Sequence, residues 1–220
     1  MLHKYHAAML AETLGQFFAP FALTEIIAAN LWQDSPFTLL GHPQIHFDNS
    51  QFAAALTYID QQHACLARAK DSHEMRAAFG RLTHGAQDFY AHSNYVDLWL
   101  AANGGLANTR PDDIDGLDPA ILNHPDLRSG TFYCWRDLIY YLPGLSGFAK
   151  KYLLFAGSHE EMNLDDESRG PRFAYALAAA KERTLAEYQR ALRTLSPDRA
   201  ALFHGQPHST ARPRLAPQKS

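Results

Sequence analysis

Residues 83–94 read THGAQDFYAHSN and lie within an apolar periodicity that predicts one long helix, beginning near residue 72 and ending near residue 102. In such a helix His84, Asp88 and His92 follow one another at intervals of four, so two imidazoles and a carboxylate form a stripe on one face. Imidazole and carboxylate are ligands that zinc prefers, and iron, manganese or nickel also accept them. We therefore interpret the stripe as part of a metal site.

The alternative interpretation of the stripe is a solvated polar face. The flanking positions argue against it because they carry large apolar side chains: Phe79, Leu82, Phe89, Tyr90, Tyr95 and Trp99. The three side chains span about 12 Å along the helix axis, so one ion cannot easily contact all of them. Two ions ~3.5–4 Å apart could share them if other segments supply further ligands.

The composition indicates an ordinary globular protein. The chain has 220 residues, of which 46% are hydrophobic, and a net charge of -3, which supplies no electrostatic footprint for duplex nucleic acid. Cys65 and Cys134 are too few for a disulfide framework. We see no signal peptide and no apolar stretch of ~20 residues, so we expect a cytoplasmic protein without a transmembrane segment. The oligomeric state is left undefined.

The remaining periodicity is helical, which predicts an all-α fold: a single bundle of five to seven helices around a buried metal site. Asp71, with Glu74 three positions later, is a typical capping box for the long helix. We expect a helical metal-binding domain over residues 1–204, with an irregular excursion at 103–130, and a disordered tail over residues 205–220. The expected helices cover residues 2–18, 20–31, 50–69, 71–102, 132–155 (as one or two helices) and 170–195.

Candidate ligands outside the stripe are His6, Asp34, His46 and His159. His6 equally fits a hydrogen-bonded core histidine, and Asp34 also fits a turn before Ser35 and Pro36. We interpret Asp48 as a cap of the third helix rather than as a ligand. Five other histidines are expected at the surface: His63, His73, His124, His204 and His208.

The order of these side chains over residues 1–165 resembles the zinc-dependent phospholipase C family, whose fold is shared by the fungal single-strand nucleases. The stretch QDFYAHSN at residues 87–94 is closest to the Het-C-like branch of that group. The family's helical bundle holds a cluster of three zinc ions. Carried onto this chain, the resemblance implies the metal ligands His6, Asp34, His46, His84, Asp88, His92 and His159. The chain departs from the family's pattern at Asn163, where the family has a glutamate. Asp165 or Glu161 is a possible substitute for that glutamate.

The function that this resemblance implies is zinc-dependent hydrolysis of a small phosphodiester or phospholipid. One to three zinc ions would activate water, and Asp34 or Asp88 would orient that water or bridge the ions. The alternative is a non-catalytic Het-C-like bundle with a structural metal that binds a lipid or protein partner. A ferritin-type bundle is disfavoured because the chain has no Glu-x-x-His motif.

Overall fold

The computed structural model describes residues 1–35, 38, 41–132 and 155–206 of the chain. Within these residues there is no β-strand, only isolated bridges, so the predicted all-α class is confirmed. The helices are α1 (His3–Leu14), α2 (Pro20–Leu31), α4 (Phe52–Arg68), α5 (Ser72–His92), α6 (Tyr95–Ala102), α7 (Pro119–Leu122), α10 (His159–Met162), α11 (Arg172–Arg193) and α12 (Pro197–His204). Short 3₁₀ turns also form: η1 (Trp32–Asp34), η2 (Pro43–His46), η3 (Pro111–Asp113) and η4 (Glu167–Arg169).

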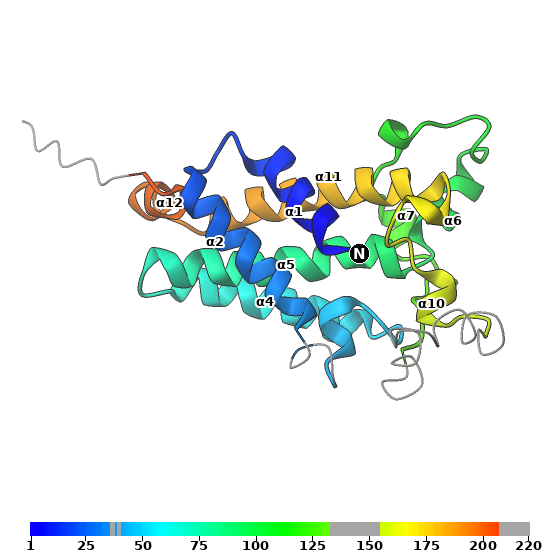
Figure 1. The fold of residues 1–220 in the computed structure, drawn as a ribbon, viewed down its shortest axis with the longest axis horizontal. Coiled ribbons are helices and arrows are strands. Elements are labelled where there is room, and N and C mark those ends of the chain that lie inside the picture. The colour runs from blue at the N-terminus through cyan, green and yellow to red at the C-terminus, as the bar shows by residue number, and fades with distance from the viewer. Residues whose placement is uncertain (36–37, 39–40, 133–154, 207–220) are drawn as a thin grey trace, which may run out of the picture.

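Helix α5 runs through the middle of the bundle, where α2, α4 and α11 pack against it (Figure 1). It is buried on all sides over its second half, and Phe79, Leu82 and Tyr90 have no exposed surface. A helix surrounded in this way can carry polar side chains only if each one finds a partner inside the protein. The histidines and the carboxylate in the buried half of α5 must therefore have partners inside the protein.

The two ends of α5 have different causes. At its start the Asp71 carboxylate accepts a hydrogen bond from the Glu74 amide at 2.8 Å, so the predicted cap is confirmed. At its end the prediction of one helix to residue 102 is wrong. Ser93 adopts an extended conformation and its hydroxyl donates to the Phe89 carbonyl at 2.6 Å, while the Asn94 amide bonds to the Arg128 carbonyl. Two helices, α5 and α6, therefore take the place of the one predicted helix.

Other helix predictions agree with the structure in part. The third helix, expected at 50–69, is α4, but the first helix ends at Leu14 rather than near residue 18. The last predicted helix is α11, and α12, which Ser196 caps, was not predicted. The helices expected at 132–155 and most of the predicted C-terminal tail lie outside the described residues.

We expected His63 at the surface, but it is buried between α4 and α11. Its Nε2 lies 2.7 Å from Glu187 Oε2, and Arg183 Nε donates to Glu187 Oε1 at 2.6 Å. Burial would raise the pKa of Glu187, but the hydrogen bond from His63 and the charge of Arg183 outweigh it and lower the pKa from 4.5 to about 2. This pairing satisfies a carboxylate that would otherwise destabilise the core.

Replacing Glu187 by Gln should lower the free energy of unfolding by about 3 kcal/mol at pH 7. A carboxyl group with a depressed native pKa stabilises the fold fully above its unfolded value of 4.5, and loses that contribution as the pH falls towards about 2. Urea unfolding of both proteins at pH 7 and pH 2 measures this. The difference between the native chain and Glu187→Gln should shrink at pH 2, and an equal difference at both pH values would contradict the assignment.

Candidate metal centre

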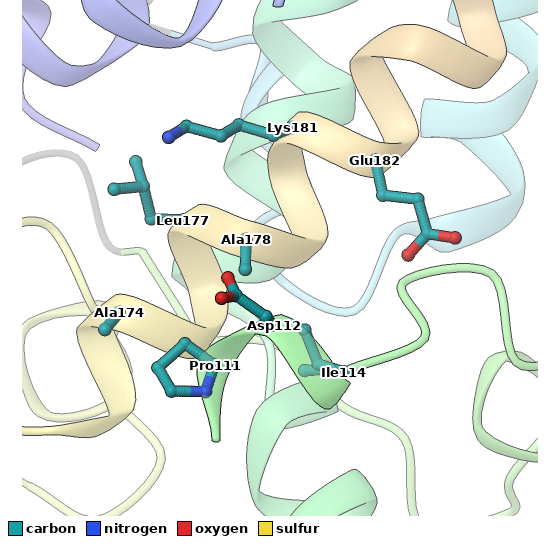
Figure 2. A pocket seen from close by; sticks show the side chains of 8 residues that line it. All are labelled: Pro111, Asp112, Ile114, Ala174, Leu177, Ala178, Lys181 and Glu182. Carbon is teal, nitrogen blue, oxygen red and sulfur yellow. The ribbon is translucent and has the colours of Figure 1, made fainter.

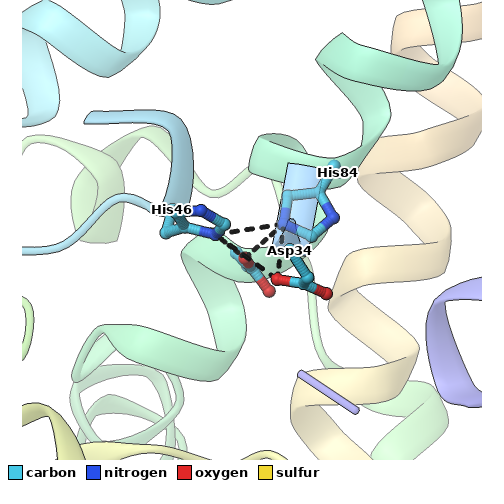
Figure 3. A group of neighbouring side chains, drawn as sticks. Asp34, His46 and His84 are labelled. Atoms are coloured by element: carbon cyan, nitrogen blue, oxygen red, sulfur yellow. Dashed lines mark hydrogen bonds and ion pairs between the residues drawn. The ribbon is translucent and has the colours of Figure 1, made fainter. Parts of the chain in front are cut away.

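Four side chains from three segments converge beside α5. His84 and Asp88 lie one turn apart on α5, Asp34 ends η1 and His46 ends η2. Figure 3 shows Asp34, His46 and His84 turned towards one another. Their inner atoms are close: His84 Nε2 lies 2.9 Å from Asp88 Oδ2, 3.1 Å from His46 Nδ1 and 3.4 Å from Asp34 Oδ1. His46 Nδ1 lies 3.0 Å from Asp88 Oδ2 and 3.8 Å from Asp34 Oδ1. We call Asp34, His46, His84 and Asp88 the first group.

A glycine lets the segment that carries His46 approach α5. A Cβ atom on Gly85 would lie 2.7 Å from the Ile45 carbonyl oxygen, so η2 can reach this position only against a glycine. After His46 the chain reverses through Phe47, which has a left-handed φ of 57°. Gly85 therefore sets how close His46 comes to His84.

Asp48, His92 and His159 form a second group of buried potential ligands. Asp48 Oδ1 lies 2.8 Å from His159 Nδ1 and 3.6 Å from His92 Nδ1. His92 Nδ1 also lies 2.8 Å from the His46 carbonyl oxygen, which only accepts, so Nδ1 carries the proton. The free lone pair of His92 is therefore on Nε2, which points between the two groups, 3.3 Å from Asp165 Oδ1 and 3.8 Å from Asp88 Oδ1.

The end of the irregular excursion holds the second group together. The extended residues 129–131 bond to all three segments that carry it. The Gly130 carbonyl accepts from the Asn49 amide at 2.9 Å, and the Gly130 amide donates to the His92 carbonyl at 2.9 Å. The His159 amide donates to the Thr131 carbonyl at 3.0 Å. Residues far apart in the sequence are thus fixed by one short backbone ladder.

His6 completes the assembly from α1. Its ring stacks on His84 with the centroids 4.5 Å apart, and its Nε2 lies 3.2 Å from Asp88 Oδ1, out of line for a hydrogen bond. Asp88 therefore has one oxygen towards the first group and the other towards His6. The seven predicted ligands lie near one another but do not form one cluster: Asp34, His46, His84 and Asp88 make the first group, His92 and His159 belong to the second, and His6 lies beside Asp88.

Two carboxylates that the sequence interpretation did not count among the ligands lie at the centre, and an amide that it discussed lies outside it. Asp48 does not cap α4, which begins after Gln51 without a side-chain cap. Asp165 lies beside His92, whereas Asn163 is in neither group and its Nδ2 donates to the Glu160 carbonyl. Asp165 had been considered only as a substitute for the family's glutamate. In the sequence, Asp48 follows His46 in a stretch that contains the apolar residues Ile45 and Phe47, which could have indicated that Asp48 is a buried ligand. The same pattern also fits a turn.

The centre strongly attracts positive charge. The Met1 amino group lies 2.8 Å from Asp88 Oδ1 and 3.0 Å from Asp165 Oδ1. Burial would lower the pKa of this amine, but Asp165, Asp88 and Asp34 raise it to about 11. Burial of His159 is likewise outweighed by Asp48, which raises the histidine pKa to about 9. His84 differs, because burial lowers its pKa to about 4 and leaves a neutral imidazole.

A pocket of about 520 Å³ opens over both groups. Asp34 and His46 line it from the first group, and all three members of the second group reach it as well. A groove of similar size, about 510 Å³, lies between η3 and α11 (Figure 2). Two of its charged side chains are paired, Lys181 with Glu12 and Glu182 with the Gly116 amide, and no histidine lines it, so we assign the candidate site to the first pocket.

Comparison with known proteins points to one family. A family model of the VWA7 N-terminal domain matches residues 2–105. The human von Willebrand factor A domain-containing protein 7 is 38% identical over 80 residues, which are 35% of this chain and 9% of that protein. The rat and mouse proteins of the same name are 34% identical over 80 residues. The chain thus spans a small part of the curated relatives it matches, and no solved structure matches it.

These matches overturn the resemblance to the phospholipase C family and its Het-C-like branch, and the phosphodiesterase interpretation with it. The resemblance depended on the order of seven side chains, whereas the family model covers a continuous stretch of sequence. Histidines and carboxylates at these spacings suit many metal centres and do not identify a reaction. The hydrolytic role inferred for Asp34 and Asp88 and the Het-C-like alternative therefore lose their support, while the geometry of the two groups stands.

Gly85→Ala should weaken zinc binding at least tenfold and lower the free energy of unfolding by about 1–3 kcal/mol, because the new methyl group pushes η2 and His46 away from α5. The matched control is Gly116→Ala, whose Cβ would lie 2.8 Å from the Ala179 carbonyl oxygen, outside both groups. Urea unfolding and zinc titration measure the two effects. Both variants should be destabilised, and equal losses of zinc affinity would show that Gly85 has no special role.

Proposed function

We propose that this chain is a helical metal-binding domain, related to the N-terminal domain of VWA7 proteins, that binds zinc through the first and second groups. The first group lies wholly within residues 2–105, the range that the family model matches. The second group takes His159 from beyond that range. Metal binding by the first group is therefore the part of the proposal most closely tied to the family.

The observation that carries the proposal is the spacing of the inner atoms of the first group. Ligands ~2.0–2.2 Å from a tetrahedral zinc ion are separated from one another by ~3.3–3.6 Å. The five measured separations among His84 Nε2, His46 Nδ1 and the two carboxylates lie between 2.9 and 3.8 Å. Two imidazoles and two carboxylates at this spacing match the donor chemistry of zinc, and small inward or outward adjustments accommodate the ion.

Charge balance favours more than one ion. Asp48 and Asp88 are buried, and Asp34 and Asp165 are each only 21% exposed. Without metal, a protonated His159 offsets part of the charge of -4 on these four carboxylates; metal binding requires neutral histidines, and two divalent ions would then neutralise all four carboxylates. Uncompensated buried charge of this size would destabilise the fold.

A second ion would be held by Asp48 and His159, whereas His92, whose Nδ1 donates to the His46 carbonyl, offers only its Nε2, towards Asp165 and Asp88. His6 and His92 Nε2 face the Oδ1 atom of Asp88, so this carboxylate can bridge two neighbouring cation positions. The 520 Å³ pocket leaves the centre open to solvent and to small ligands. The first group offers four protein ligands, as a closed structural zinc site does, whereas the second group offers fewer and leaves room for a ligand from the pocket.

The native chain should bind at least two zinc ions after removal and replacement of metal, and His84→Ala should bind at least one fewer. Zinc at a thousandfold excess over its Kd adds ~4 kcal/mol to the stability of the native state, so this variant should also lose most of its zinc-dependent rise in Tm. The matched control is His73→Ala, on the same helix but with a side chain that is 72% exposed. Elemental analysis and thermal unfolding measure both, and a His84→Ala protein with full zinc content and an unchanged Tm would refute the proposal.

Asp48→Asn should lose one ion while the first group keeps its own, because the amide is neutral and a weaker ligand than the carboxylate. Asp60→Asn, whose carboxylate is 62% exposed on α4, is the control. Stoichiometry by elemental analysis distinguishes the two groups. If Asp48→Asn retains every ion, the second group is not a metal site.

A further inference from the structure

Five fully buried polar side chains form a network beside the first group. His6 on α1, Asn30 on α2, Thr83 and Gln87 on α5 and Thr184 on α11 each have no exposed surface. Of these five, only His6 faces Asp88 directly. Polar groups buried at the junction of four helices are costly unless hydrogen bonds satisfy them, and here the bonds run in a determinable direction.

The first anchor of the network is a helix carbonyl on α11. Thr184 Oγ1 lies 2.8 Å from the Ala180 carbonyl oxygen, which can only accept, so the hydroxyl proton is directed there. The remaining lone pairs of this hydroxyl accept from Gln87 Nε2 at 3.1 Å. The Gln87 amide therefore turns its NH₂ towards Thr184 and its oxygen towards α1.

The second anchor is the Thr83 hydroxyl on α5, and it gives the Gln87 amide the same orientation. Thr83 Oγ1 donates to the Gly80 carbonyl at 2.9 Å and thus accepts from Asn30 Nδ2 at 3.2 Å. The Asn30 NH₂ also donates to Gln87 Oε1 at 3.2 Å. Rotating the Gln87 amide by 180° would set NH₂ against NH₂ and leave buried hydrogen bonds unmade.

His6 is where the network ends. Its Nδ1 lies 2.6 Å from Gln87 Oε1, an oxygen that only accepts, so Nδ1 carries the proton. In the neutral ring the lone pair is then on Nε2. That atom is buried, has no hydrogen-bond partner and lies 3.2 Å from Asp88 Oδ1.

We propose that Gln87 is a positioning residue of the metal centre: held by Asn30 and Thr184, it fixes His6 in the Nδ1–H tautomer and thereby keeps Nε2 available as a ligand beside Asp88. This inference rests on the proposed zinc function for its consequence, but the tautomer itself exists without metal. Partners that orient a ligating histidine in this way typically contribute 10–100-fold to metal affinity.

The test compares three substitutions at Gln87 and two measurements. Gln87→Leu removes the acceptor, and Gln87→Lys presents a donor to Nδ1, so both should weaken zinc binding at least tenfold. Gln87→Glu keeps an acceptor towards Nδ1 and should bind zinc within about threefold of the native chain. Circular dichroism and urea unfolding establish that each variant is folded, and the contrast between Gln87→Glu and Gln87→Leu remains informative if one of the others is not.

The second measurement is the ¹⁵N NMR spectrum of the His6 imidazole in the metal-free native protein. We expect a protonated Nδ1 and an unprotonated Nε2 in the native chain, and the loss of this preference in Gln87→Leu, where the acceptor is gone. A protonated Nε2, or zinc affinities that are equal in Gln87→Leu and the native chain, would overturn the inference while leaving the zinc proposal intact. The expected tautomer in a native chain that binds no zinc would instead refute the proposed function.

Discussion

The burial of Asp88 is the constraint on which the rest of the structure depends. A carboxylate with no exposed surface on the central helix must have every lone pair directed at a donor or a cation. Its two oxygens face different partners: Oδ2 faces His46 and His84, and Oδ1 faces His6 and the Met1 amine. The positions of α1 and η2 against α5 follow from this requirement as much as from apolar packing.

The two oxygens of Asp88 are supported by different kinds of structure. On the Oδ1 side, His6 is held by a network that begins at carbonyls within α5 and α11 and therefore moves only if those helices move. On the Oδ2 side, His46 is carried by a short turn whose position depends on the absence of a side chain at Gly85. Precision in the first case comes from hydrogen-bond direction, and in the second from close backbone contact.

The likeness to the VWA7 N-terminal domain changes the meaning of the ligand pattern. Ligand order is a weak guide to reaction because zinc-type ligands serve unrelated activities on many helical folds. The arrangement of the two groups is a stronger basis for proposing metal binding, since it consists of separations between specific atoms. What we propose from the structure is therefore cation binding, and not a substrate.

The sequence by itself determined the helical class, the cap at Asp71 and the stripe of His84, Asp88 and His92, because these depend on local periodicity and on the fixed geometry of one turn of helix. It did not determine the break at Ser93, which a bonded neighbour from residue 128 imposes. Nor could it show that Asp48 pairs with His159, more than a hundred positions away, or that His63 is buried against Glu187. Only the tertiary structure decided these, because the direction of a side chain that follows a turn depends on what the turn packs against.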